Sequence, residues 1–365
     1  MQIKLGDFLR EICIKTVVNN EYPVLTSSKN GIYLQSEYFN KQVASKDNTG
    51  YKIIKKGQFT YRAMSDTGEF YPNMLKCVDI GIVSPAYPVF EITNRDIIYP
   101  QYLQYFFRSN TFRYNISGLE QGSTRTSIKF NKMKNIKIKL PPLLEQKKVI
   151  MILDRVGSLI FKRQEQLKYF DELTKSLFIE MFGDLVKGKY EIKKLKDISK
   201  KISDGIHSKP EYTKTGRPFL SVVNINKGKV NFEDCKYVSE ESFQKMIKST
   251  HPEKGDILYT KVGATYGIAA YIDTNVEFCL YVSVCLIKPK HYLINAKFLS
   301  IQMNMPFIKY QADNRIKGIG VPDLHLNQIR EFDIIVPPLD LQNRFADYVS
   351  SIDKSKYSSF SHLSA

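Results

Sequence analysis

An internal repeat constrains the fold of this chain more than any other feature. Residues 131–143 read NKMKNIKIKLPPL, and residues 327–339, which lie 196 positions later, read NQIREFDIIVPPL. The two segments share an asparagine, an isoleucine, both prolines and the following leucine, and four further positions carry conservative exchanges. Chance does not produce such a run, so the chain is expected to contain two copies of one structural unit.

Weaker similarities extend this repeat towards the start of each copy. Residues 3–8 resemble residues 194–198, and residues 56–61 resemble residues 254–259. The match also continues past the prolines, so a helix is expected to begin near Leu339, as one is expected to begin after the first proline pair. The predicted order along the chain is therefore globule, helix, globule, helix.

The segment from Leu143 to Asp184 is predicted to form the first of these helices. It follows two prolines and ends at Gly183, which suit a helix start and a helix end. Forty residues or so at 1.5 Å per residue give a rod of roughly 60 Å, longer than most globular helices. Its apolar residues recur at alternating spacings of three and four, which predicts a narrow apolar seam that needs a partner. The predicted helix and subunit interface consists of Val149, Ile152, Val156, Leu159, Phe170, Leu173 and Leu177.

Length and composition fit a two-domain globular protein. The chain has 365 residues, of which 43% are hydrophobic, 12% aromatic and 25% charged. These values exclude a disordered chain, and each half is long enough to bury a core. No apolar run reaches the length of a membrane helix and no signal peptide is evident, so a cytoplasmic location is expected.

Charge gives the first indication of a partner. The chain has 54 Lys and Arg against 37 Asp and Glu, a formal net charge of +17. Such an excess favours nucleic acid over a membrane surface as the partner, with solvated surface lysine as the alternative. The five cysteines form no C-x-x-C pair, so reduced core thiols are expected rather than disulfides or a zinc site.

Each globule is expected to mix short strands and helices, which makes the fold class α+β. Polar, irregular loops are expected at residues 27–46, 203–215 and 312–323, where a partner would bind. Turn signals separate the predicted strands, which are 80–83, 89–92, 219–225, 257–259, 268–272 and 279–287. Helices are expected at matching places in the two copies, residues 99–107 and 296–303.

Catalytic motifs are missing from the sequence. It contains no phosphate-binding G-x-x-x-x-G-K-[ST], no complete G-x-G-x-x-G and no Asn/Asp-Pro-Pro-aromatic motif of an amino-methyltransferase. Asp323 and Glu331 could form a nuclease carboxylate pair, but no lysine lies two residues beyond Glu331 and the other copy lacks both carboxylates. We therefore predict no catalytic residue and no metal ligand, and favour a binding role.

Several loops carry residues suited to nucleic acid. Arg, Lys, Ser, Thr and Tyr side chains on loops are typical of phosphate and groove contacts, and glycines let the backbone approach a phosphate. These residues gather in segments 203–217, 259–267 and 315–320 of the second copy, and in segments 61–68 and 121–126 of the first. The predicted DNA-binding residues are Arg62, Ser65, Ser123, Thr124, Arg125, His207, Lys209, Tyr212, Arg217, Lys261, Thr265, Tyr266, Arg315 and Lys317. For any single residue, a solvated loop is the alternative.

Taken together, these features resemble the specificity subunit of type I restriction-modification systems. The resemblance is carried by the duplicated globules, the helices after Pro-Pro, the loop Asp204–Pro210 (DGIHSKP) and the helix end Ser176–Asp184 (SLFIEMFGD). It implies two target-recognition domains separated by long helices that pack as an antiparallel coiled coil. It also implies a non-catalytic subunit for host defence that reads a bipartite site in double-stranded DNA. Methyltransferase and restriction subunits would be its partners and would carry the S-adenosylmethionine, ATP and Mg, none of which this chain would bind.

Mapped onto this sequence, the resemblance implies four parts. They are a first recognition domain at 1–142, a central helix at 143–185, a second recognition domain at 186–338 and a second helix at 339–365. Only 27 residues follow from Leu339 onward, and the last of them are serine-rich, so a truncated second helix is expected. Such a helix would leave part of the seam open and admits self-association. The alternatives are a stand-alone DNA-acting enzyme such as a nuclease, and a non-specific nucleic-acid-binding scaffold.

Overall fold

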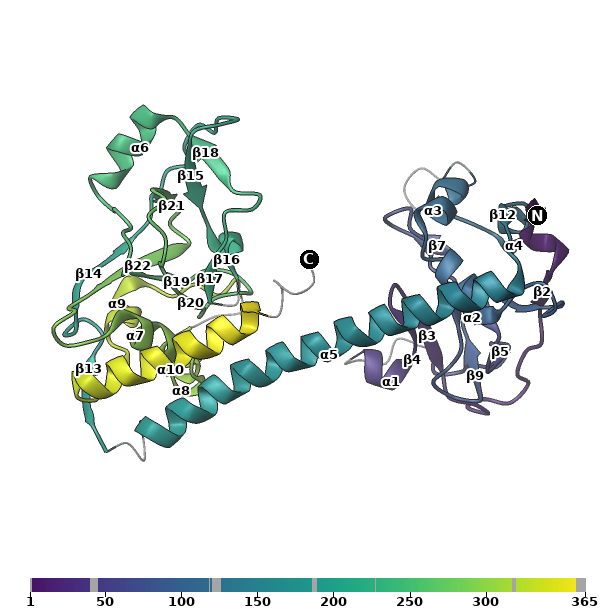
Figure 1. Ribbon diagram of the computed structural model, residues 1–365, viewed down its shortest axis with the longest axis horizontal. Coiled ribbons are helices and arrows are strands. Elements are labelled where there is room, and N and C mark those ends of the chain that lie inside the picture. The colour runs from purple at the N-terminus through teal and green to yellow at the C-terminus, as the bar shows by residue number, and fades with distance from the viewer. Residues whose placement is uncertain are drawn as a thin grey trace. The chain divides into compact units, whose positions relative to one another are not determined.

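The computed structural model describes residues 2–39, 45–117, 119, 126–185, 189–226, 228–316 and 320–358 (Figure 1). It divides the chain into two compact units, Met1–Lys162 (unit 1) and Arg163–Ala365 (unit 2). Helix α5 (Leu143–Phe182) is continuous and contributes its first half to unit 1 and its second half to unit 2. Both units mix strands and helices, which confirms the predicted α+β class.

Unit 1 is built on a four-stranded antiparallel sheet, in the order β2-β10-β6-β8. These strands are β2 (Leu9–Ile12), β10 (Val89–Ile92), β6 (Phe59–Thr60) and β8 (Asn73–Met74). The two-stranded ladders pair β1 (Gln2–Lys4) with β12 (Lys137–Lys139), β3 (Leu25–Ser28) with β4 (Gly31–Leu34), β5 (Lys52–Lys55) with β9 (Ile80–Val83), and β7 (Met64–Ser65) with β11 (Thr126–Ser127). The helices are η1 (Leu5–Asp7), α1 (Gln35–Tyr38), α2 (Pro100–Phe106), α3 (Asn110–Ile116) and α4 (Phe130–Met133).

Unit 2 has a four-stranded antiparallel sheet in the order β14-β22-β19-β20 and a three-stranded sheet in the order β18-β15-β21. These strands are β14 (Ser199–Asp204), β22 (Val284–Pro289), β19 (Ile257–Thr260), β20 (Ala269–Tyr271), β18 (Lys236–Val238), β15 (Arg217–Leu220) and β21 (Cys279–Leu280). Two ladders pair β13 (Glu191–Lys194) with β23 (Asp333–Val336), and β16 (Ile225–Asn226) with β17 (Lys229–Val230). The helices are η2 (Val222–Asn224), α6 (Glu240–Ile247), α7 (Ala296–Gln302), α8 (Pro306–Asp313), α9 (Leu326–Arg330) and α10 (Leu339–Ser358).

A buried glutamine shows that the sequence repeat is a structural repeat. In unit 1 the Gln146 amide accepts a hydrogen bond from the Tyr99 N–H (3.0 Å) and donates to the carbonyls of Ile97 (2.8 Å) and Pro141 (2.9 Å). In unit 2 Gln342 makes the same three bonds to the residues 196 positions later, Asn295, Leu293 and Pro337. Both glutamines are fully buried, so their polar groups need these partners. Each glutamine therefore joins the start of a long helix to the same turn of its own globule.

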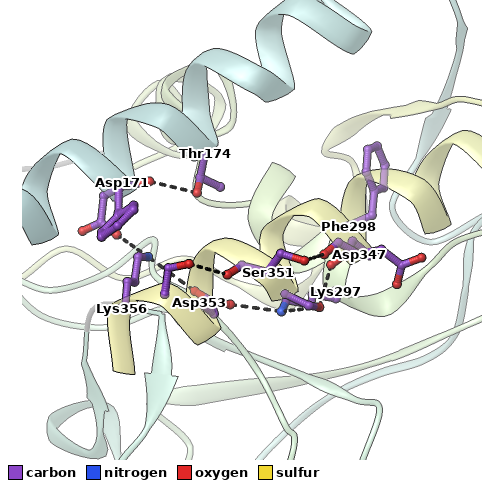
Figure 2. Close-up of polar contacts among 12 residues, drawn as sticks. Asp171, Thr174, Lys297, Phe298, Asp347, Ser351, Asp353 and Lys356 are labelled. Atoms are coloured by element: carbon purple, nitrogen blue, oxygen red, sulfur yellow. Dashed lines mark hydrogen bonds and ion pairs between the residues drawn. The ribbon is translucent and has the colours of Figure 1, made fainter. Parts of the chain in front are cut away.

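Helices α5 and α10 pack antiparallel within unit 2 (Figure 2). Near the end of α5, the rings of Phe178 and Phe182 lie 5.6 and 5.4 Å from the ring of Phe345 at the start of α10. Further back along α5, Asp171 forms a 2.8 Å ion pair with Lys356 near the end of α10 (Figure 2). The end of α5 thus contacts the start of α10, and an earlier part of α5 contacts the end of α10. They confirm the predicted antiparallel packing for this part of α5.

Four local expectations were wrong. The predicted strand 219–225 does not form as one element, because β15 ends at Leu220 and η2 follows. There the Asn224 side chain accepts a hydrogen bond from the Ser221 N–H (3.0 Å) and closes a tight turn. The predicted strand 279–287 is split into β21 and β22 by a turn, and the predicted loop 27–46 contains β4 and α1. All five cysteines are free, but Cys13 and Cys77 are exposed rather than in a core. No helix in the described ranges is long and apolar enough to cross a membrane.

Candidate nucleic-acid interface

Two of the predicted loops of unit 2 are paired with each other. The backbone of Lys261 donates to the Ser283 carbonyl (3.0 Å) and accepts from the Leu324 N–H (2.9 Å). The Gly263 N–H donates to the Pro322 carbonyl (2.9 Å), so the segment after β19 and the segment before α9 form a short ladder. The sequence placed these segments about sixty residues apart, and the fold brings them side by side.

The side chain of Lys261 connects this ladder to the third predicted loop. Its ammonium lies 3.4 Å from a carboxylate oxygen of Asp204 at the end of β14, and 4.0 Å from one of Asp323. Only 6% of the Lys261 side chain is exposed. Burial raises the pKa of Asp204, and the charge of Lys261 opposes that rise. A buried charge is stable only with such a partner, so the pair holds three loops together.

The loop after Asp204 is held tightly against the neighbouring strands. A Cβ at Gly205 would lie 2.3 Å from the Leu280 carbonyl oxygen, so only glycine fits there. The Gly205 and Ile206 N–H groups donate to the carbonyls of Val284 (3.2 Å) and Leu280 (2.8 Å). His207 follows, and its imidazole is 77% exposed. The fold therefore fixes the base of this loop and presents the next side chains to solvent.

A hollow of about 1050 Å³ lies beside this loop. It is lined by segments 199–208 and 242–250 and by residues at the start and end of α9. Its basic lining residues, of which Lys196 and Lys245 are in ion pairs, outnumber the acidic Asp204 and Glu211; they are Lys196, Lys200, Lys201, His207, Lys245 and Arg330. Phosphate groups are usually held by such side chains together with hydroxyl groups, and Ser203 and Ser208 also line the hollow. The arrangement suits the backbone of a nucleic acid.

The predicted DNA-binding residues of unit 2 fall into two groups. His207, Lys209 and Thr265 are exposed and could reach a ligand without rearrangement. The others have partners within the fold, as the following contacts show. Lys261 is buried against Asp204; Arg217 pairs with Glu240 (2.6 Å) and Glu277 (2.7 Å); Arg315 donates to the carbonyls of Gln311 (2.8 Å) and Glu331 (3.1 Å); Tyr212 packs on Phe219, and the Tyr266 hydroxyl donates to Asp313. These five side chains support the loops, and contact with DNA stays a prediction for all of them.

In unit 1, Arg62 and Ser65 line a second hollow, of about 730 Å³. The Ser65 hydroxyl accepts hydrogen bonds from the N–H groups of Thr67 (3.2 Å) and Glu69 (3.1 Å) and so shapes the turn after β7. The predictions for Ser123, Thr124, Arg125 and Lys317 lie outside the described residues. Sequence reasoning missed the lysines and Arg330 around the first hollow, although the Lys200-Lys201 pair beside the predicted loop was a usable signal.

The predicted seam of α5 is only partly covered. In unit 2, Phe170 and Leu177 are half-buried, Leu173 is exposed, and the fully buried side chains are Phe178 and Phe182, which the prediction omitted. Both phenylalanines lie on the same helix face as Thr174 and Met181, and this spacing could have revealed them. In unit 1, Val149, Ile152, Val156 and Leu159 have exposed fractions between 37% and 62%.

The two carboxylates that could suggest a nuclease lie next to different lysines. Asp323 lies near Lys261, and Glu331 forms a 2.6 Å ion pair with Lys196. The pKa of the Glu331 carboxyl is lowered, mainly by its hydrogen bond with Lys196. Within the described ranges, no three His, Cys, Asp or Glu side chains come together as a metal site would require.

Comparison with known proteins gives one family for both units. The family model described as type I restriction modification DNA specificity domain matches residues 4–169 and again residues 187–359. The MjaIX type I restriction enzyme specificity subunit of Methanocaldococcus jannaschii is 24% identical over 286 residues, which are 72% of this chain and 64% of that protein. The EcoKI specificity subunit of Escherichia coli is 25% identical over 179 residues, 45% of this chain and 38% of that protein. The chain thus spans less than two thirds of the length of these curated relatives.

Two solved structures are similar along nearly the whole chain. One, described as the S subunit of a type I restriction-modification system from M. genitalium, has a TM-score of 0.54 at 15% identity and covers 100% of this chain and 92% of that one. Another, from work on complex assembly and conformational transition of the type I R-M system, has a TM-score of 0.55 at 17% identity, with coverages of 98% and 91%. At these identities the likeness establishes the fold.

Proposed function

The chain belongs to the family of type I restriction-modification DNA specificity domains, and from this membership we propose that it is a sequence-specific DNA-binding subunit. Each unit would read one half of a bipartite site in double-stranded DNA, with residues 1–142 and 186–338 as the two recognition domains. The observation that carries the proposal is the joining of three polar loops by Lys261, Asp204 and Asp323 beside a basic hollow. Rigid loops that present exposed polar side chains are what sequence readout requires.

The chain would act as a non-catalytic part of a larger complex. Methyltransferase subunits and restriction subunits would supply the chemistry, with S-adenosylmethionine, ATP and Mg bound by them. The absence of a P-loop from the sequence supports this division of labour. A non-specific scaffold is the competing function, and it predicts salt-sensitive binding without a preferred sequence.

Changing the exposed loop residues of unit 2 is expected to alter one half of the recognised site. We expect the double variant His207→Ala, Lys209→Ala to lose about 1–3 kcal/mol of discrimination at the bases read by this loop. Fluorescence anisotropy with a library of duplexes would identify the preferred bipartite site before and after the change. Lys254→Ala, an exposed lysine of the same unit away from the loop, is the control. Changes in both halves, or no preferred site in the unchanged protein, would refute the proposal.

The uncovered part of α5 is proposed as a surface for a partner subunit or a second copy. An apolar stripe of this length on a surface helix is typical of a contact site. It continues the face that α10 covers further along the same helix. Partner binding through this stripe would bury its residues as α10 buries Phe178 and Phe182 in unit 2.

Polar residues in this stripe are expected to weaken assembly without unfolding the protein. Ile152→Gln with Val156→Gln removes apolar area from the stripe, at positions that are already exposed. Met151→Gln with Phe161→Gln is the matched control, because these exposed residues lie on other faces of the helix. In analytical sedimentation with the methyltransferase subunit, the Ile152, Val156 variant should bind at least about tenfold more weakly than the unchanged protein. The control variant should bind as the unchanged protein does. Equal behaviour of the two pairs would count against the proposed surface.

A further inference from the structure

The ring of Tyr71 in unit 1 lies among three cationic side chains. The ammonium of Lys29 is 5.8 Å from the ring centroid, and the guanidinium carbons of Arg108 and Arg113 are 5.2 and 6.0 Å from it. The three residues come from separate segments, which follow β3, follow α2 and lie in α3. The Tyr71 hydroxyl donates a 2.6 Å hydrogen bond to Glu69. This bond, with the charges of Lys29 and Arg113, lowers the pKa of the Glu69 carboxyl.

The three cations have different tasks. Arg108 is half-buried and donates to the Lys29 carbonyl and to the Asn73 side chain, so it braces the site. Lys29 and Arg113 are exposed, and neither forms an ion pair within 4.0 Å with any residue that the structure describes. Their charges are therefore available to a ligand.

The hollow beside Tyr71 carries unbalanced positive charge. Lys29, Arg62, Asp66, Glu69 and Tyr71 all line it. With Arg108 and Arg113, which lie beside the same ring, the described charged groups are four cations and two carboxylates. Ser28 and Thr67 also line the hollow, and hydroxyl residues are common in phosphate sites. Like charges held this close repel unless an anion joins them.

Unit 2 has a similar cation–tyrosine pair, with the cation at the equivalent position of the repeat and the tyrosine at a different one, and there the charge is neutralised. Lys309, which lies 196 positions after Arg113, sits 3.6 Å from the centroid of Tyr266. Asp313 pairs with Lys309 and also accepts the Tyr266 hydroxyl. The residue 196 positions before Asp313 is Ser117. Both units thus place a cation of the same helix on a tyrosine ring, and only unit 1 lacks the neutralising carboxylate at that position.

We propose that Lys29 and Arg113, arranged around Tyr71 and braced by Arg108, bind the phosphate backbone of DNA on unit 1. The inference rests on the proposed DNA-binding function and adds the place where the first unit would hold the strand. Two exposed cations suit a phosphate, whereas the Tyr71 hydroxyl donates its proton to Glu69 and has none free for reading a base. The site would supply affinity rather than sequence preference.

The test is the salt dependence of DNA binding by the full chain. Lys29→Gln with Arg113→Gln should lower affinity by about tenfold, equally for a preferred and a random-sequence duplex, and should reduce the slope of log K against log salt by about 1–2. The control is Lys76→Gln with Lys137→Gln, which removes the same charge from exposed lysines of unit 1 that do not line the hollow. Fluorescence anisotropy at several NaCl concentrations gives both quantities, and circular dichroism checks the fold.

The outcomes separate this inference from the proposed function. If the unchanged protein prefers one bipartite site but the two double variants have equal slopes, the phosphate site is wrong and the function stands. If the Lys29, Arg113 variant loses slope but the unchanged protein prefers no sequence, the phosphate site stands and sequence-specific recognition is wrong. An unchanged protein that binds no duplex at low salt overturns both.

Discussion

Phe178→Ala is expected to destabilise unit 2 by about 3–5 kcal/mol, the range for removing a buried phenylalanine side chain. The Phe178 ring is fully buried and lies 5.5 Å from Phe298 of α7 and 5.6 Å from Phe345 of α10. Its loss would leave a cavity where three helices meet. Because the same ring attaches α5 to the globule, the amides at the end of α5 should lose their protection from hydrogen exchange together with those of the core.

Leu173→Ala is the matched control for this prediction. Leu173 is on the same helix but is 50% exposed, so its truncation should cost less than about 1 kcal/mol. Urea unfolding followed by circular dichroism measures both changes in the free energy of unfolding. Hydrogen exchange measured by mass spectrometry should be faster for the unit 2 amides of Phe178→Ala than for those of the unchanged protein. The exchange of unit 1 amides should not change. Equal effects of the two variants would contradict the role assigned to Phe178.

Lys261→Met is expected to cost about 3–5 kcal/mol, because it leaves the half-buried carboxylate of Asp204 without its cation. The effect should be smaller in the double variant Lys261→Met, Asp204→Asn, which removes both charges. Lys209→Met, which changes an exposed lysine in the loop after Asp204, should change stability little. Urea unfolding of the unchanged protein, Lys261→Met, Asp204→Asn and the double variant gives the coupling between the two residues. A double variant that is no more stable than Lys261→Met would show that the pair does not hold the loops.

The same variant should change the titration of Asp204. Burial already raises the folded-state pKa of Asp204 above its ordinary value, so this group favours folding at low pH, and that contribution is lost as pH rises through the folded pKa. Removing the Lys261 charge should raise the pKa of Asp204 further and move this loss to higher pH. Carbon-13 NMR of the aspartate carboxyl groups would measure the shift, and a lower pKa in the variant would contradict it.

Much of the fold could be predicted because its signals are local or repeated. The limits of α5 follow from Pro142, Gly183 and the spacing of apolar residues, and the structure places the helix at Leu143–Phe182. The start of α10 at Leu339 followed from the repeat alone. The long helices were therefore accessible to sequence reasoning, and so was their antiparallel packing through the family resemblance.

The polar loops of unit 2 were predictable as segments, but which of their side chains are free was not. Arg217 and Arg315 are of residue types typical of DNA contacts, yet both have partners within the fold. Arg217 pairs with the carboxylates of Glu240 and Glu277, and Arg315 donates to backbone carbonyls on either side of it in the sequence. Lys29 and Arg113 went unnoticed because they are 84 positions apart and only the fold brings them to Tyr71. Whether a charge is paired depends on its distant neighbours, which composition does not specify.

By itself, the sequence determined the duplication, the two long helices and the absence of recognisable catalytic motifs, because periodicity and repeats need no knowledge of distant contacts. The tertiary structure alone decided which apolar residues of α5 are buried and which charges remain free. Phe178 is covered by α7 and α10 while Val156 is not, and Lys309 meets Asp313 while Arg113 meets no acidic partner at that position. These differences arise from pairings between residues far apart in the chain, and such pairings set the free energy of a buried ring or a free charge.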